Sequence, residues 1–223
     1  MLLTSEKTFE TAIIDALVPD GGWMQGNAKT FDRDLALFPS QIFQFLRDTQ
    51  DKRLNKITDI HGVETENKLL QRLAKEMDLR GSLDVLRNGF TDHGVRFDMA
   101  YFKPETSLNE QSAALYGKNI LAVTRQVFYS KDNNKSLDLV LSLNGVPVAT
   151  LELKNQFSGQ NVQNAERQYM HDRDPRELIF QFKKRTLVHF TVDDNEVYMT
   201  THLNRENTRY LPFNKGFNNG KGN

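Results

Sequence analysis

The sequence predicts a protein of the α/β (α+β) class, and two kinds of residue spacing support this assignment. Near the N-terminus, apolar residues such as Phe9, Ile13 and Leu17 recur every three or four positions, which is typical of an amphipathic helix. Farther along, apolar and polar residues alternate over residues 137–154, which is typical of strands with one buried face. The chain also contains 15 phenylalanines, so we expect a real hydrophobic core rather than disorder.

Helical spacing and end signals together predict five helices. Thr4 or Ser5 can cap the N-terminal helix, and the Pro- and Gly-containing residues 19–22 end it. Gly81 stands just past the third helix, where glycine commonly terminates one. The remaining helices are expected at residues 38–47, 64–79, 107–116 and 161–171.

Alternation predicts six strands. Val95, Phe97 and Met99 alternate with polar or small residues, and Pro104 stops that strand because proline cannot donate a backbone hydrogen bond. The strands are expected at residues 95–101, 120–129, 137–143, 146–154, 186–192 and 196–201.

Composition excludes several classes of function. Cysteine is absent, which removes disulfides, thiolate zinc sites and cysteine nucleophiles, and fits a cytoplasmic protein. No apolar run is long enough to span a membrane, so we expect no membrane association. The formal net charge is zero, whereas a protein that binds DNA unaided is often basic, which counts against tight autonomous DNA binding.

Two carboxylates and one amine are predicted to meet on a hairpin formed by residues 137–154. The dipeptide Asn144-Gly145 favours a tight reversal because both residues tolerate positive φ. Asp138 lies on the first strand, while Glu152 and Lys154 lie two residues apart on the second and therefore share a face. Paired carboxylates can hold a divalent metal and a lysine can assist the attacking water, which indicates a metal-dependent phosphodiesterase.

The register of this hairpin decides whether the three side chains share a face. A regular two-residue loop places Asp138 opposite Leu151, on the wrong face. A three-residue loop or one bulge places Asp138 opposite Glu152 instead. We therefore predict an irregularity within residues 144–147, because the site requires it.

Magnesium is the expected metal, since it prefers oxygen ligands in near-octahedral geometry. Asp138, Glu152 and the backbone carbonyl of Leu153 supply such oxygens, and Lys154 can stabilise developing negative charge. An acid on a helix often completes such a site, and the candidates in order of preference are Glu10 and then Glu64 or Glu66. The alternative is a set of solvated side chains on the open face of a half-buried sheet, because a bare D…ExK pattern is short.

Other polar residues are candidates for phosphate contacts with DNA. Two precede the hairpin on the adjoining strand and three follow it; they are Arg125, Gln126, Gln168, Tyr169 and Arg173. The five histidines show no paired metal-ligand spacing, and His189 on an apolar strand is expected to be a packed, hydrogen-bonded residue.

Three segments around this hairpin resemble the PD-(D/E)xK nuclease motif: SLDLV at residues 136–140, NGVP at 144–147 and LELKN at 151–155. Together with Phe9-Glu10 and the runs at residues 167–169, 172–178 and 211–216, they resemble more narrowly the N-terminal nuclease domain of the type I restriction enzyme R subunit. That subunit is the motor and cleavage subunit. The resemblance touches nearly the whole chain.

This resemblance implies a restriction-endonuclease-like core, with a central mixed β-sheet flanked by helices. It implies cleavage of double-stranded DNA that depends on Mg²⁺, for which Mn²⁺ can substitute, with Asp138, Glu152 and Lys154 as the catalytic trio. Separate methylation and specificity subunits are then the partners that recognise the target. Many relatives carry a Q-x-x-x-Y motif after the lysine, but here Ala165 stands four residues before Tyr169, so Gln168 or Gln163 is the candidate replacement.

The resemblance also implies ATP-driven helicase-like domains that follow this one. The chain contains no G-x-x-x-x-G-K-[ST] phosphate loop, so ATP is expected to bind only in that missing part. We expect a nuclease domain at residues 1–211 and a flexible segment at 212–223 that links it to those domains. Two alternatives stay open: another PD-(D/E)xK nuclease, acting in repair or on junctions, and a catalytically silent domain that docks DNA or partner subunits.

Overall fold

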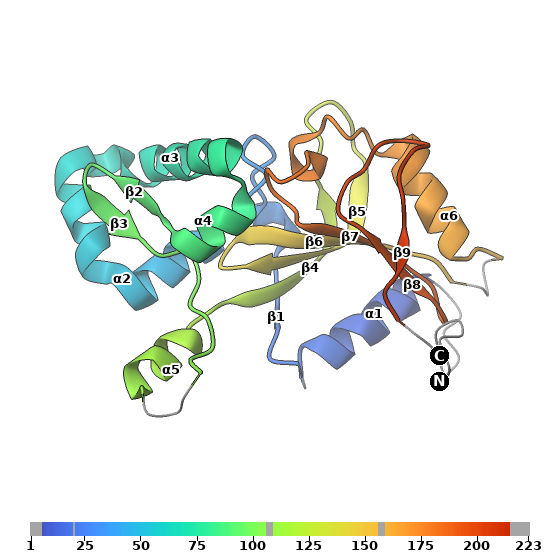
Figure 1. Ribbon diagram of the computed structural model, residues 1–223, viewed down its shortest axis with the longest axis horizontal. Helices are drawn as coiled ribbons and strands as arrows, with labels where there is room; N and C mark the ends of the chain where they lie inside the picture. Colours follow the sequence, from blue (N-terminus) through green and yellow to red (C-terminus); the bar gives the residue numbers. More distant parts are fainter. Residues whose placement is uncertain (1–5, 20, 106–108, 156–158, 215–223) are drawn as a thin grey trace.

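A mixed β-sheet forms the centre of the molecule (Figure 1). The computed structural model describes residues 6–19, 21–105, 109–155 and 159–214. In this part of the chain the sheet has seven strands in the order β1-β4-β5-β6-β7-β8-β9. The β1–β4 and β6–β7 pairs are parallel and the others antiparallel. The strands are β1 (Met24–Gln25), β4 (Leu121–Phe128), β5 (Ser136–Leu143), β6 (Val146–Leu153), β7 (Val188–Val192), β8 (Val197–Thr200) and β9 (Leu211–Pro212).

Helices flank this sheet, which confirms the predicted fold class. They are α1 (Glu6–Leu17), α2 (Pro39–His61), α3 (Thr65–Arg80), α4 (Ser82–Asn88), α5 (Glu110–Tyr116) and α6 (Val162–Arg167), with short 3₁₀ turns at Ala28–Thr30, Gly62–Glu64 and Leu178–Phe180. Helix α2 is longer than predicted, because it continues through a kink at Gln50. The helix expected at residues 161–171 changes after Arg167 into a π-helical turn, Gln168–Asp172.

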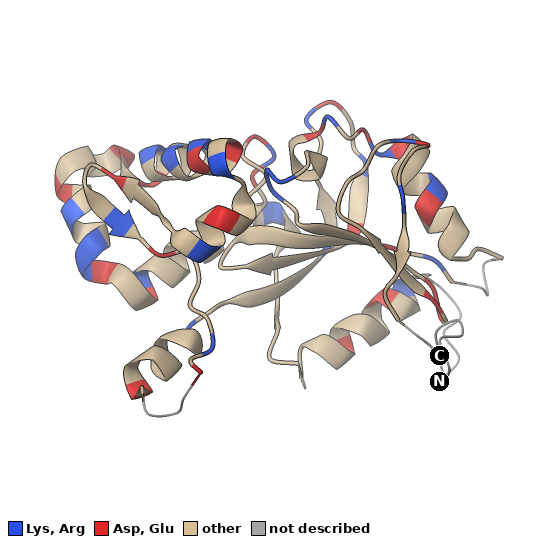
Figure 2. Ribbon diagram, in the orientation of Figure 1, with Lys and Arg blue, Asp and Glu red and all other residues tan. Residues whose placement is uncertain are grey.

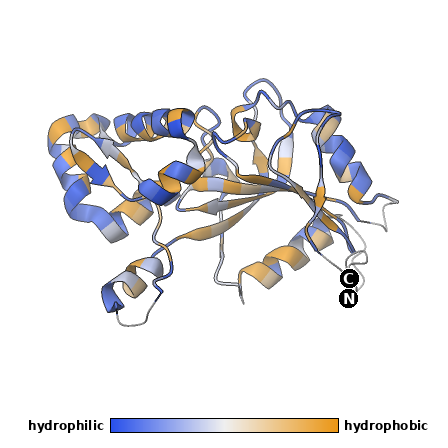
Figure 3. Cartoon of the chain, viewed as in Figure 1, coloured by the Kyte–Doolittle hydropathy of each residue, from blue (hydrophilic) through white to orange (hydrophobic). Residues whose placement is uncertain are grey.

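The two faces of the sheet are covered by different elements (Figure 1). On one face, Phe9 and Ile14 of α1 pack against Leu139, Leu151 and Leu153 of the central strands. On the other face, the residues that follow α6 pack against β4 and β5; they include Tyr169, Ile179 and Phe180 with Val127 and Val140. The central strands are mostly apolar (Figure 3), and charged residues gather on the helices and loops (Figure 2).

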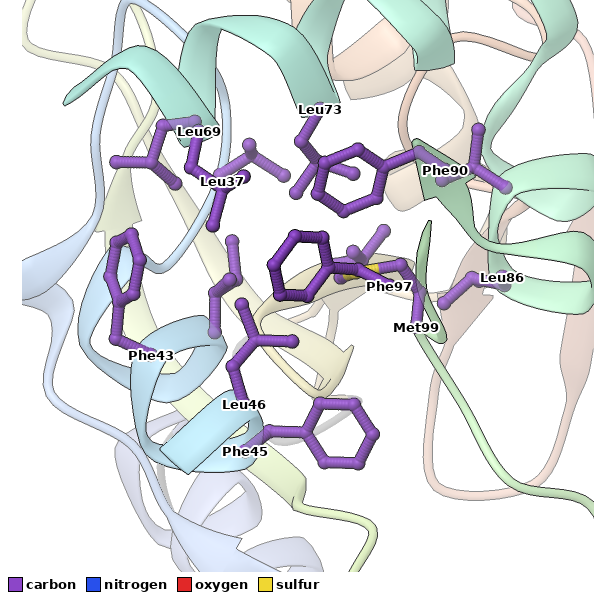
Figure 4. Packing of buried hydrophobic residues seen from close by; sticks show 14 of the residues in the cluster. Leu37, Phe43, Phe45, Leu46, Leu69, Leu73, Leu86, Phe90, Phe97 and Met99 are labelled. Carbon is purple, nitrogen blue, oxygen red and sulfur yellow. The ribbon is translucent and has the colours of Figure 1, made fainter. Parts of the chain in front are cut away.

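A helical lobe, defined here as residues 39–99, lies to one side of the sheet (Figure 1). It contains α2, α3, α4 and a small hairpin of β2 (Phe90–Asp92) and β3 (Val95–Phe97), which is shorter than the strand predicted at residues 95–101. Its interior is an apolar cluster in which Phe45, Leu73 and Phe97 are almost fully buried (Figure 4). Periodicity found α2 and α3, but α4 and β2 were not predicted.

The turn between β5 and β6 reverses the chain as predicted, but the predicted irregularity lies outside the turn. Asn144 and Gly145 have φ values of 51° and 85°, and Leu143 pairs with Val146, so the loop is a regular two-residue turn. The register shifts beyond it: Leu141 pairs with Ala149 and Ser142 with Pro147. Val148 is therefore the extra residue of a bulge. The bulge sits one residue past the predicted range because Pro147 has no N–H to give to the ladder there.

The sheet extends beyond residue 211, where the domain was expected to end. Strand β9 pairs with β8, and the Phe213 N–H donates to the Val197 carbonyl at 2.7 Å. The Phe213 ring also packs on Phe190, with centroids 5.0 Å apart. The ordered domain thus reaches at least Asn214, and the expected linker from residue 215 onward lies outside the described residues. Among the described helices, none is long and apolar enough to cross a membrane.

Candidate active site

Asp138 and Glu152 lie opposite each other where β5 and β6 approach the α6 end of the sheet. The pairing of Leu139 with Leu151, continued by one residue, places Asp138 opposite Glu152. Asp138 accepts a hydrogen bond at Oδ2 from the Leu153 N–H, at 2.8 Å. The bulge at Val148 thus produces the facing pair that the sequence required, although it lies outside the predicted range.

Glu152 is fully buried, and Arg173 is its ionic partner. The Arg173 Nε donates to Glu152 Oε1 at 2.7 Å, and Arg173 Nη2 donates to the Ser136 carbonyl at 2.7 Å. The guanidinium also lies over the Tyr129 ring, 5.5 Å from its centroid. The second oxygen, Glu152 Oε2, is buried and has no hydrogen-bond partner among the described residues. Of the two carboxylate oxygens, Oε1 therefore accepts a hydrogen bond and Oε2 accepts none from the described part of the chain.

The electrostatics of this pair favour the arrival of a cation. Burial raises the pKa of Glu152 well above its usual range; Arg173 opposes that rise, and the nearby charge of Asp138 adds to it. An unpartnered carboxylate oxygen in the interior is costly unless a positive group compensates it. A divalent ion held by Glu152 would supply that charge.

Glu10 of α1 is joined to Asp138 through a single amide. Gln126 Nε2 donates to Glu10 Oε1 at 2.6 Å and to Asp138 Oδ1 at 3.4 Å. Arg125 also binds Glu10, with Nε 3.0 Å from Oε2. Gln126 has a φ of 48° within β4, a conformation that non-glycine residues seldom adopt and that is often found at functional sites. Glu10, the helical acid preferred from the sequence, therefore lies close to Asp138. In this structure two side chains, those of Arg125 and Gln126, bind its carboxylate.

Lys154 lies at the edge of a groove with a volume of about 280 Å³. Lys154 lies two residues after Glu152, directly past the end of β6, and is 9% exposed. The groove is lined by Lys154, Gln160, Asn164, Arg167, Gln168, His171 and Asp172. Gln168, one of the predicted DNA contacts, therefore lies beside the lysine on an accessible surface.

Several predicted roles are corrected by burial or position. Tyr169 is fully buried with its hydroxyl 2.7 Å from Thr150 Oγ1, so in this arrangement it cannot reach DNA. Arg173 is only 4% exposed and is bound to Glu152, so it is not a DNA contact either. Glu66 lies in the helical lobe, where it pairs with Arg47, and Glu64 precedes the same helix, so neither reaches the trio.

Oxygen donors of this site fit a hard divalent cation. Asp138 and Glu152 Oε2 offer carboxylate oxygens of the kind that Mg²⁺ and Mn²⁺ prefer, and the predicted third oxygen is the carbonyl of Leu153, whose N–H binds Asp138. Among the described residues, Glu10, Asp138 and Glu152 do not come together as a group of three ligands. A small ion with retained waters suits such an open pair, because Mg²⁺ commonly binds through one or two carboxylates.

Two functional contacts were missed in the sequence. Arg173 was taken for a DNA contact, although its partner is Glu152, and Gln126 was not expected to bridge two acids. A signal existed only for Gln126: continuing the β4–β5 alternation places it opposite Asp138. By contrast, His189 is packed as predicted, 1% exposed and 2.7 Å from Thr150 Oγ1.

Comparison with known proteins supplies the family. A family model described as "Type I restriction enzyme R protein N terminus" matches residues 4–208. No curated protein and no solved structure matches the chain. The family suggests a nuclease-related role in restriction, a divalent metal cofactor, and DNA and a restriction complex as partners. Since the match covers most of its length, the chain belongs to the family of type I restriction enzyme R protein N termini.

Proposed function

We propose that this chain is the endonuclease domain of a type I restriction enzyme R subunit, and that it hydrolyses phosphodiester bonds in double-stranded DNA with Mg²⁺. The observation that carries the proposal is Glu152 Oε2, a buried carboxylate oxygen without a hydrogen-bond partner among the described residues. It faces Asp138 across the hairpin and lies two residues before Lys154. A purely structural carboxylate buried at this depth is normally satisfied on both oxygens.

Each residue of the trio has a distinct role in this proposal. Asp138 and Glu152, with the Leu153 carbonyl, hold the ion, which when bound polarises a phosphoryl oxygen and acidifies a water. Lys154 orients the attacking water and stabilises the negative charge that develops on the phosphate. Glu10 is the third acid, and Arg125 and Gln126 fix its carboxylate near Asp138.

Arg173 acts through Glu152 rather than on DNA. Its guanidinium binds Oε1, so that Oε2 would be the oxygen that holds the ion, and Arg173 is a positioning residue. DNA contacts are assigned to the groove beside Lys154, where Arg167 and Gln168 are accessible. These residues contact phosphates without reading sequence, which leaves target recognition to the methylation and specificity subunits.

The remaining parts of the activity belong to the intact enzyme. ATP-driven translocation requires helicase-like domains that follow this one, and it delivers DNA to the nuclease in the cytoplasm. We expect the isolated 223-residue chain to cleave DNA weakly or not at all.

The test is a cleavage assay with the intact R subunit in its restriction complex, using ATP, Mg²⁺ and target DNA. Asp138→Asn, Glu152→Gln and Lys154→Ala should each lower cleavage by at least about a hundredfold while ATP hydrolysis continues. Glu66→Gln, which removes an exposed acid in the helical lobe away from both the trio and the groove, is the control and should cleave normally. Normal cleavage by Asp138→Asn or Glu152→Gln would overturn the proposal.

A further inference from the structure

A second group of metal-ligand side chains lies in the helical lobe, separate from Asp138 and Glu152. His61 is the last residue of α2, and Asp92 and His93 lie at the turn of the β2–β3 hairpin. One ligand atom from each of these residues lies within 4.8 Å of the others. The lobe is on the opposite side of the molecule from α6 (Figure 1), so this group is independent of the candidate active site.

One carboxylate holds both imidazoles. His61 Nε2 is 2.7 Å from Asp92 Oδ2, and His93 Nδ1 is 3.3 Å from Asp92 Oδ1. The two rings meet edge to face, with centroids 4.8 Å apart. The side chains of His61 and Asp92 are 7% and 10% exposed, whereas His93 is 55% exposed. The group is thus anchored by two nearly buried ligands and closed on its solvent side by a third.

The backbone presents His93 at some conformational cost. His93 has a φ of 44° and Gly94 a φ of 78°, so the hairpin turn has two consecutive left-handed residues. Asparagine or aspartate is the usual first residue of such a turn, and histidine is a less common choice. The hairpin is itself fixed: Phe90 and Phe97 stack in the lobe core, and Arg72 Nε donates to the Thr91 carbonyl at 3.0 Å.

We propose that His61, Asp92 and His93 form a binding site for Zn²⁺ or a similar late first-row divalent ion, with a fourth position open to solvent. Two imidazole nitrogens and one carboxylate suit such ions, whereas Mg²⁺ and Mn²⁺ prefer sites made of oxygens alone. Bonds of about 2.0–2.2 Å put the ligand atoms of a tetrahedral site roughly 3–3.5 Å apart. His61 Nε2 and Asp92 Oδ2, now 2.7 Å apart, would therefore open slightly, and the ligand atoms that lie up to 4.8 Å apart would close toward the ion.

The ion would clamp the β2–β3 hairpin to the end of α2. His61 and Asp92 are 31 residues apart in the sequence, so the metal would cross-link two elements of the lobe. Its expected effect is to stabilise the lobe rather than to take part in phosphodiester hydrolysis.

The test is calorimetric titration of ZnCl₂ into the full 223-residue chain in the presence of excess Mg²⁺, with Co²⁺ absorption in the visible range as a second readout of coordination. We expect one Zn²⁺ binding event that persists in Asp138→Asn and weakens by at least about a hundredfold in His93→Ala. His93 is the ligand of choice for substitution because its exposure makes misfolding improbable as an explanation; Asp92→Asn is the second variant. Zn²⁺ should also raise the melting temperature of the wild type but not of His93→Ala.

His202→Ala is the matched control, since His202 is an exposed histidine that stacks on Phe182 outside the group. It should bind Zn²⁺ like the wild type. Absence of Zn²⁺ binding in the wild type, or equal affinity in wild type, His93→Ala and Asp92→Asn, would overturn the proposal. Either result would leave the proposed nuclease function untouched, because that rests on other residues.

Discussion

The helical lobe and the end of the sheet that carries the candidate active site are built on opposite principles. The large cluster in the lobe is made of apolar side chains, with Phe45, Phe97 and Met99 fully buried (Figure 4). The active-site end of the sheet instead buries charged groups, among them Glu152 and Arg173. Burial of a large apolar side chain contributes roughly 1.5–3 kcal/mol, whereas a buried ion pair often contributes little net stability. The lobe therefore stabilises the fold, and the sheet end retains charges that the proposed chemistry needs.

The largest effect on stability is expected in the lobe. Phe97→Ala should lower the free energy of unfolding by about 3–5 kcal/mol, because Phe97 is fully buried and stacked on Phe90. Urea unfolding followed by circular dichroism measures this. Under native conditions the folded Phe97→Ala variant should still bind Mn²⁺ at Asp138 and Glu152. A loss below about 1 kcal/mol would show that the lobe core does not have the assigned role.

Removal of the buried positive charge of Arg173 at the sheet end should have the next largest effect on stability. Arg173→Met leaves Glu152 without its partner and should lower the free energy of unfolding by about 3 kcal/mol. Arg176→Met removes the same charge from an exposed residue three positions away and should have no measurable effect. Equal urea midpoints for the two variants would contradict the structural importance of the buried pair.

Per pH unit, a smaller effect should appear as a pH dependence of stability from His189. Burial lowers the pKa of His189 from 6.5 to about 3, so the folded protein keeps the ring neutral while the unfolded chain protonates it below pH 6.5. Stability from this group is complete above pH 6.5 and falls as the pH drops toward 3, by up to about 1.4 kcal/mol per pH unit.

His189→Asn is the control for this effect, because its amide can replace Nδ1 beside Thr150 without titrating. The difference in unfolding free energy between wild type and variant should shrink steadily under acid conditions. A pH-independent difference would show that His189 is not the titrating group.

The smallest effect is expected at the surface of the lobe. Glu66→Gln breaks the exposed pair with Arg47 and should change the free energy of unfolding by less than about 0.5 kcal/mol. It should also leave Mn²⁺ affinity unchanged, since Glu66 lies away from the trio. Calorimetry that shows weakened Mn²⁺ binding in this variant would restore Glu66 as a ligand candidate.

Local chemistry made the hairpin predictable from the sequence. Asn144-Gly145 specifies its turn, and the two-residue period of a strand places Glu152 and Lys154 on one face. The need for a bulge followed from parity alone. Its position did not, because the extra residue is set by where Pro147 interrupts the ladder.

Contacts between distant segments were not predictable in the same way. The pairing of Arg173 with Glu152 depends on how the chain returns to the sheet after α6, which no spacing in the sequence encodes. The group of His61, Asp92 and His93 was missed for the same reason, since α2 and a very short hairpin bring it together. Tyr169 was misplaced because an aromatic residue near basic ones resembles a DNA contact even when it packs inside.

Calorimetric titration of Mn²⁺ into the wild-type chain, Asp138→Asn, Glu152→Gln and the Glu66→Gln control tests the central claim most directly. The account predicts binding in the wild type and control that is lost in both trio variants, because Asp138 and Glu152 hold the ion together. Absence of binding in the wild type, or equal binding in all four proteins, would contradict it. The chain would then be better described as a catalytically silent domain that docks DNA or partner subunits.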